Sequence, residues 1–131
     1  MKEITRINHV GLRVKSLDIS RSFYDKLGFA FIAGPLGPEP VAIMAHPSGV
    51  TINLILNAAD NPVLNVLMDL PRKHTGYTHM ALEINDLESV QKQLKHFDIP
   101  VTEGPVTMPG GTISLFIRDP DGNVIEFHKP A

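Results

Sequence analysis

The sequence contains no cysteine and no tryptophan, and only 6% of its residues are aromatic. Without cysteine the chain can form no disulfide, no thiolate metal site and no cysteine nucleophile. It also has no apolar run that approaches the roughly 20 residues of a membrane-spanning helix. Neither sign of charge dominates, because 12 basic residues stand against 14 acidic ones. This balance argues against nucleic acid as a partner.

What is present is ordinary for a globular protein: 43% of the 131 residues are hydrophobic and 20% are charged. The length fits one compact domain, or two small halves that share one fold. The first residues, MKEITRINH, lack the basic and then apolar layout of a signal peptide. We therefore expect a cytoplasmic protein that has no membrane partner.

The chain repeats itself at an offset of 70 residues. The segments RINHVGLRVKS (6–16) and YTHMALEIND (77–86) both alternate between apolar and polar residues. A period of two predicts strands that have one buried face. At this offset His9 lies opposite His79, both on the polar side of their strands.

A helix is predicted after each of these strands. Ser16 and Asp86 are capping residues, and an acid follows in each first turn, where the helix dipole favours negative charge. Gly28 and Asp98 lie opposite each other where the helices should end. The helices are then followed by two segments rich in proline and glycine, AGPLGPEP and EGPVTMPGG, which we expect to be loops.

Beyond these loops the offset becomes 73 residues. Strands are predicted at 41–44 and 51–56, and their counterparts at 114–117 and 124–128. The turns HPSG and DPDG join the strands of each pair, and Asn53 lies opposite Glu126. Each half is thus predicted to be a β-α-β-β-β module, with module one at 4–57, module two at 77–129 and a connector at 58–76 that holds at most one short helix.

A half of about 55 residues with one helix cannot cover a four-stranded sheet alone. Two halves can do so if they pack together with their helices outside. We therefore predict a single α+β domain, 1–131, in which two tandem βαβββ modules form curved mixed sheets around a shared cavity. Equivalent positions of the two modules would then meet in that cavity.

Three residues on the polar faces predict a metal site there: His9, His79 and Glu126. Two neutral imidazoles and one carboxylate form the facial triad that binds a divalent ion such as Fe, Mn, Ni, Co or Zn and leaves coordination positions open. A small substrate with adjacent oxygens could occupy these positions, and the metal would stabilise its charge as a Lewis acid. Glu126 is also the best candidate for proton transfer.

Four further residues are candidates for binding the substrate, and each has a simpler alternative. Asn53 could bind a ligand or the metal, or only a water molecule. Arg13 could contact an anionic group of the substrate, or form a salt bridge with Glu83, its repeat equivalent. Phe116 could shape an apolar pocket or belong to the core, and His128 could line the rim of the site or end a strand in solvent.

The segments INHVGLRVKSLDISRSFYDKLGF, YTHMALEINDLESV and FIRDPDGNVIEFH resemble the vicinal oxygen chelate superfamily, which includes glyoxalase I, extradiol dioxygenases and bleomycin-resistance proteins. The resemblance covers essentially the whole chain. It implies paired βαβββ modules, metal ligands at His9, His79 and Glu126, and frequent homodimers. Bacterial-type glyoxalase I carries a second glutamate where this chain has Asn53, so its fourth protein ligand is missing here.

Three functions are compatible with the resemblance. The first is a metal-dependent glyoxalase-like lyase or isomerase of the lactoylglutathione-lyase type. The second is an Fe(II) extradiol-type dioxygenase that cleaves aromatic rings. The third is a small-molecule binder of the bleomycin-resistance type without activity, although such binders usually lack the ligand triad.

Overall fold

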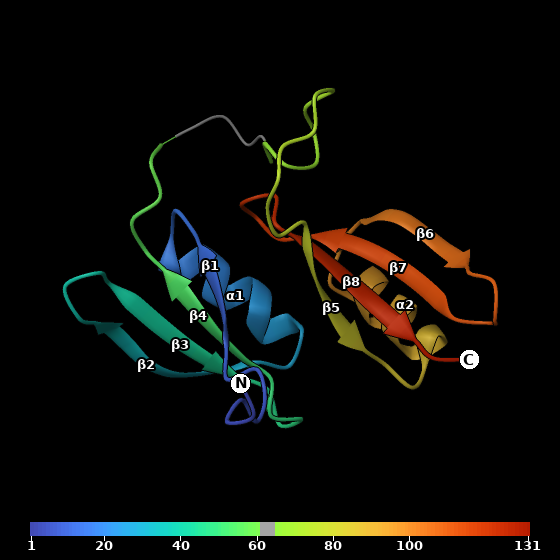
Figure 1. Ribbon diagram of the computed structural model, residues 1–131, viewed down its shortest axis with the longest axis horizontal. Coiled ribbons are helices and arrows are strands. Elements are labelled where there is room, and N and C mark those ends of the chain that lie inside the picture. The colour runs from blue at the N-terminus through green and yellow to red at the C-terminus, as the bar shows by residue number, and fades with distance from the viewer. Residues whose placement is uncertain (61–64) are drawn as a thin grey trace. The chain divides into compact units, whose positions relative to one another are not determined.

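Each half of the chain folds as a β-α-β-β-β module in this computed structural model, which describes residues 1–60 and 65–131 (Figure 1). The chain divides into two units, Met1–Asn61 and Pro62–Ala131. The first contains β1 (Val10–Arg13), α1 (Leu17–Lys26), β2 (Ala30–Leu36), β3 (Val41–Ala45) and β4 (Thr51–Ile55). The second contains β5 (His79–Glu83), α2 (Leu87–His96), β6 (Val101–Thr107), β7 (Ile113–Arg118) and β8 (Val124–Lys129).

The two mixed sheets have the same topology, with strand orders β1-β4-β3-β2 and β5-β8-β7-β6. In each sheet one outer strand runs parallel to its neighbour and all other pairs are antiparallel. Gly11 pairs with Asn53, and its repeat equivalent Ala81 pairs with Glu126. The two predicted βαβββ modules and the predicted register of the repeat are therefore confirmed.

The helices begin and end where the repeat predicted. The Ser16 side chain accepts a hydrogen bond from the Ile19 amide, and the Asp86 side chain accepts one from the Ser89 amide, which satisfies amides that the first helical turn leaves unpaired. Asp98 ends the second helical segment with a φ of 53°, in the left-handed region that commonly ends a helix.

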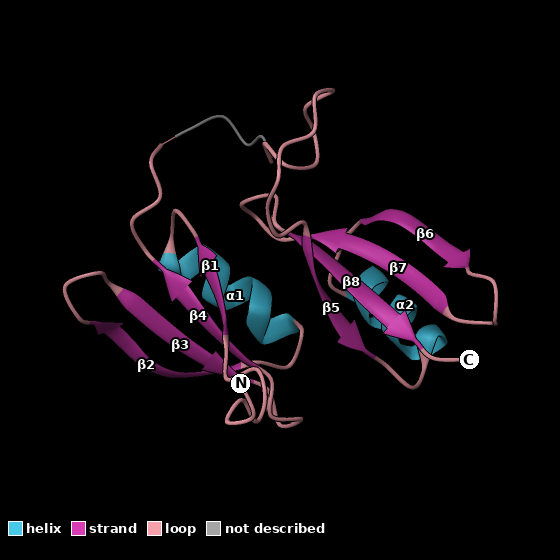
Figure 2. Ribbon diagram, in the orientation of Figure 1, coloured by secondary structure: helices cyan, strands magenta, loops and turns pink. Residues whose placement is uncertain are grey.

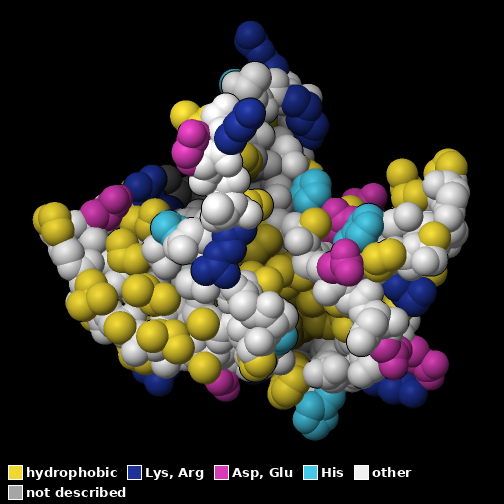
Figure 3. Space-filling model, turned by 60° about the horizontal axis from the view of Figure 1, so that its bottom comes forward, with side chains coloured by type: hydrophobic (Ala, Val, Ile, Leu, Met, Phe, Trp, Pro, Cys, Tyr) yellow, Lys and Arg dark blue, Asp and Glu magenta, His cyan; other side chains and the backbone are white. Residues whose placement is uncertain are grey.

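Each sheet has one apolar face, and the helix of its unit lies against that face (Figure 2). Met44, Ile52 and Leu54 are fully buried in the first unit. Tyr24, on α1, is also fully buried. Figure 3 shows hydrophobic side chains, in yellow, on the surface of the protein. Ile32 on β2, for example, is 58% exposed.

The prediction that the two proline- and glycine-rich segments are loops was only partly right. About half of each segment is strand, because β2 continues to Leu36 and β6 to Thr107. Both are edge strands, where Pro35 and Pro105 can be accommodated although proline has no N–H to donate to the ladder. In the connector, residues 65–78 form turns and bends and no helix, while residues 61–64 lie outside the described part of the chain.

The two predicted turns are present and share one construction. Gly49 and Gly122 each donate a backbone hydrogen bond to the first residue of their turn. The side chain of that first residue, His46 or Asp119, also accepts a hydrogen bond from the amide two residues later. No helix within residues 1–60 and 65–131 is long and apolar enough to cross a membrane.

Candidate functional site

Glu126 is the centre of a polar cluster on the sheet of the second unit. It lies on β8 between Ala81 of β5 and Phe116 of β7, and only 10% of its side chain is exposed. The Ser114 hydroxyl donates a hydrogen bond of 2.6 Å to Oε1 of Glu126. Nδ1 of His128 lies 3.1 Å from the same oxygen.

His79 faces the other oxygen of this carboxylate. Its Nε2 lies 3.0 Å from Oε2 of Glu126, and 36% of its side chain is exposed. The Phe116 ring packs edge to face against the His79 ring, with centroids 5.9 Å apart. Four of the seven residues predicted for the site therefore lie together in one unit: His79, Phe116, Glu126 and His128.

The surroundings of Glu126 favour its charged form. Burial raises the pKa of this carboxyl, but the hydrogen bonds from Ser114 and His128 lower it, as does the charge of His79. The lowering effects outweigh burial, so the pKa of Glu126 lies below its usual value. The carboxylate is therefore ionised at neutral pH, which is the form that binds a metal.

His9 and His79 are oriented in the same way by the residues that precede them. Nδ1 of His9 lies 2.9 Å from Oδ1 of Asn8, and Nδ1 of His79 lies 2.9 Å from Oγ1 of Thr78. An amide oxygen can only accept, so Nδ1 of His9 carries the proton. In the neutral ring Nε2 then has a free lone pair, which is the state required of a metal ligand.

Two donor atoms of the second unit have a separation that one divalent metal ion could bridge. Two donor atoms bound about 2.1 Å from one ion, and at a right angle to each other, lie about 3.0 Å apart. Nε2 of His79 and Oε2 of Glu126 have this separation. Within residues 1–60 and 65–131 no group of three or more histidine and acidic side chains is arranged to hold a metal, and the predicted triad draws its residues from both units.

The equivalent face of the first unit is mostly apolar. Asn53 occupies the position of Glu126, between Gly11 and Ile43. Val41 and Ile55 stand at the positions equivalent to Ser114 and His128. The amide of Asn53 therefore lacks the hydroxyl and imidazole partners that surround the carboxylate in the other unit.

Arg13 forms a salt bridge within its own unit. Its Nη2 lies 3.1 Å from Oε1 of Glu39, and its Nε donates a hydrogen bond of 2.8 Å to Asn57. The side chains of Arg13 and Glu39 are 57% and 52% exposed, so this ion pair is worth little to stability. The observed ion-pair partner of Arg13 is Glu39, whereas Glu83 was the predicted one, and a role of Arg13 in substrate binding stays a prediction.

Sequence reasoning missed two features of the second unit. The first is Ser114, the one hydroxyl in the otherwise apolar run ISLFI. Only its position on the same face of the sheet as Glu126 could have indicated that it belongs to the site.

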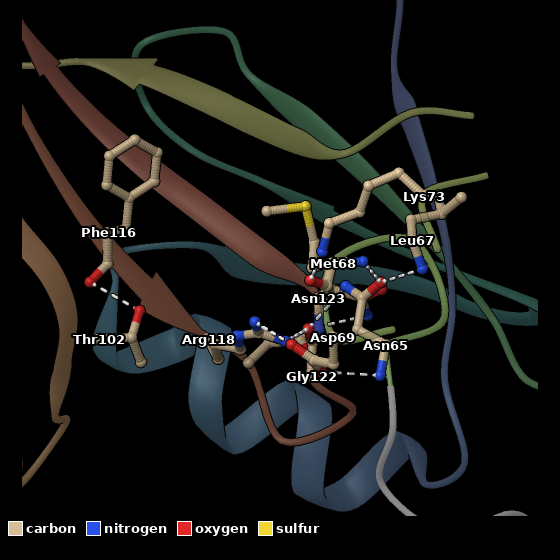
Figure 4. A network of polar contacts seen from close by, with 11 residues as sticks. Asn65, Leu67, Met68, Asp69, Lys73, Thr102, Phe116, Arg118, Gly122 and Asn123 are labelled. Carbon is tan, nitrogen blue, oxygen red and sulfur yellow. Dashed lines mark hydrogen bonds and ion pairs between the residues drawn. The ribbon is translucent and has the colours of Figure 1, made fainter. Parts of the chain in front are cut away.

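The second feature is a bidentate ion pair in which Arg118, at the end of β7, contacts Asp69 of the connector at 2.7 and 3.0 Å (Figure 4). Asn65 and Arg118 both donate to the carbonyl of Gly122, so these contacts fix the connector to the DPDG turn.

This ion pair predicts a pH-dependent stability. The hydrogen bonds from Arg118 hold the pKa of Asp69 below its usual value, so the pair stabilises the fold above the pKa of the unfolded carboxyl, about 3.9. The stabilisation is lost as the pH falls through the folded pKa. We expect Asp69→Asn to lower the midpoint of urea unfolding at about pH 7, and this difference from wild type to shrink below about pH 4.

The control is Glu88→Gln, which removes an exposed ion pair with Lys92 on α2. Its unfolding midpoint should match that of wild type at both pH values, because both side chains are more than 70% exposed. An Asp69→Asn difference that stays constant down to about pH 2 would contradict the assignment to this carboxylate.

Comparison with known proteins gives related sequences along the whole chain. The family model of the Glyoxalase/Bleomycin resistance protein/Dioxygenase superfamily matches residues 6–127. A lactoylglutathione lyase from Haemophilus influenzae is 31% identical over 128 residues, which are 93% of this chain and 90% of that protein. The metallothiol transferase FosB from Bacillus licheniformis is 29% identical over 130 residues, which are 96% of this chain and 76% of that protein.

A solved structure shares the fold. It is a variant of the fosfomycin resistance protein FosX from Listeria monocytogenes, in complex with Mn(II) and 1S,2S-dihydroxypropylphosphonic acid. The TM-score is 0.73, the sequences are 16% identical, and the match covers 98% of this chain and 94% of that chain.

Proposed function

Because this chain belongs to the glyoxalase/bleomycin resistance protein/dioxygenase superfamily, we propose that it is a metal-dependent enzyme of the glyoxalase-like kind. It would act as a lyase or isomerase on a small substrate that carries adjacent oxygens. The observation that carries the proposal is the pairing of Nε2 of His79 with Oε2 of Glu126 at 3.0 Å. An ionised, nearly buried carboxylate beside an imidazole has the chemistry of two metal ligands.

His9, His79 and Glu126 would hold the ion. His9 is included because it shares the repeat position of His79, and because its Nδ1 likewise contacts the side chain of the preceding residue. We propose that the two modules act as one domain, 1–131, to which each contributes ligands, and that the protein works as a homodimer. The donor set suits Fe, Mn, Ni, Co or Zn, and the bound metal would supply Lewis-acid stabilisation of an oxyanion on the substrate.

The other residues of the chain orient the substrate and move its proton. Glu126 is also the proposed proton acceptor, and because Oε1 is held by Ser114 and His128, Oε2 would have to leave the metal or be weakly held by it to take the proton. Phe116 and His128 border this carboxylate and would contact the substrate. On the first module, the amide of Asn53 would form a hydrogen bond with the substrate, and Arg13 would bind an anionic group of the substrate.

The proposal is tested by assays of protein stripped with a chelator and of the same protein reloaded with single metals. We expect isomerisation of the hemithioacetal of methylglyoxal and glutathione to vanish on stripping and to return with at least one metal. Oxygen uptake with a catechol would indicate the dioxygenase, and thiol addition to fosfomycin would indicate the transferase. Metal-independent binding of a small molecule that survives His9→Ala, with no turnover, would contradict the proposal.

A further inference from the structure

We propose that Ser114 is a positioning residue that anchors Oε1 of Glu126, so that the carboxylate presents only Oε2 to the metal. This inference rests on the proposed function, because it concerns the same site. It assigns a role to a residue that touches neither metal nor substrate. It also predicts how Glu126 binds the metal: through one oxygen, with the other oxygen held by the protein.

The two oxygens of the Glu126 carboxylate have different partners. Oε1 receives the hydroxyl of Ser114 at 2.6 Å and lies 3.1 Å from Nδ1 of His128. Oε2 faces Nε2 of His79 instead. A carboxylate whose one oxygen already accepts a short, charge-assisted hydrogen bond cannot turn freely to chelate a metal with both oxygens.

Ser114 is well placed to hold this orientation. It is 8% exposed and lies on β7 directly opposite His128 of β8. The backbone around it is closely packed, because a Cβ on Gly104 of β6 would lie 2.6 Å from the Ser114 carbonyl oxygen. A hydroxyl on a fixed, buried backbone loses little conformational entropy when it forms the bond.

The internal repeat supports the role independently. The first module has Asn53 in place of Glu126, and there Val41 replaces Ser114 and Ile55 replaces His128. The donors thus accompany the carboxylate and are absent around the amide. If the Ser114 hydroxyl contributed only to the packing of β7, a hydroxyl at this position would be expected equally in both modules, whereas it occurs only in the module that carries Glu126.

The affinity for Mn(II), measured by titration calorimetry on the whole chain, tests the proposal. Loss of a residue that orients a metal ligand typically costs about 10–100-fold in metal affinity, and we expect this loss for Ser114→Ala. Ser114→Thr keeps the hydroxyl and should bind Mn(II) within about threefold of wild type. The matched control is Thr102→Val, which removes a hydroxyl of the same sheet that bonds the Phe116 carbonyl instead (Figure 4).

Two further measurements separate the possible outcomes. Urea unfolding of the metal-free proteins should show Ser114→Ala and Thr102→Val folded under the titration conditions. With Co(II) bound, the visible spectrum of Ser114→Ala should differ from that of wild type, because a freed carboxylate changes the coordination of the ion. Wild-type affinity and spectrum in Ser114→Ala, or an equal loss in Thr102→Val, would overturn the role of Ser114. Failure of wild type to bind any divalent metal would overturn the proposed function itself.

Discussion

Replacing Glu126 with glutamine is expected to lower kcat/KM by about 10²–10⁴-fold, the range that a positioned acid or base contributes. The substitution keeps the shape of the side chain and removes its charge. An amide has a single oxygen, which can either accept the hydrogen bond that Ser114 donates to Oε1 at 2.6 Å in the wild type or bind the metal, while the two proposed imidazole ligands are unchanged. Metal content should therefore fall only in part, while the proton acceptor is lost completely.

Steady-state kinetics and elemental analysis on the same preparation measure the two effects separately. The control is Glu103→Gln, because Glu103 is an exposed acid on β6 of the same sheet. It should keep the kcat/KM and the metal content of wild type. Full turnover in Glu126→Gln would remove Glu126 from the chemistry, and complete loss of metal would make it a ligand with no separable role in proton transfer.

Replacing His9 or His79 with alanine is expected to weaken Mn(II) binding by more than about 100-fold, beyond the range seen for residues that only orient ligands. The two losses should be similar, because the residues share one repeat position and Nδ1 of each contacts the side chain of the preceding residue. Nε2 of each ring is the proposed ligand atom. The comparison is direct, because both substitutions are made in the same chain and measured with the same ion.

His74→Ala and His96→Ala serve as controls, since both side chains are exposed and lie outside the two sheets. They should bind Mn(II) as wild type does. A large loss in His79→Ala together with no loss in His9→Ala would contradict the triad, and would confine the site to the second unit.

The repeat made most of the fold predictable. Alternating residues at 6–16 and 77–86 and the turns HPSG and DPDG predicted both sheets and their register, because a strand with one buried face must alternate. The superfamily, too, is confirmed. Proline and glycine misled the prediction at β2 and β6, since they mark turns more often than edge strands.

The site was predictable only in part. His79, Glu126, Phe116 and His128 lie on one face by period two, so the sequence could bring them together. The partners of charged residues could not be found in this way, because Arg118 meets Asp69 at a separation of 49 residues and Arg13 meets Glu39 at 26. These pairs depend on the conformation of loops near the strand ends, and loops have no sequence periodicity from which their conformation could be predicted. The metal triad itself stays a prediction.

Anomalous diffraction from crystals of the wild-type protein loaded with Mn(II) tests the central claim most directly. The ion gives a peak that locates it without reference to any assumed ligand. We predict one peak per chain, bonded to Nε2 of His79, Oε2 of Glu126 and Nε2 of His9. No peak at these atoms, or a peak bonded to other residues, would contradict the account.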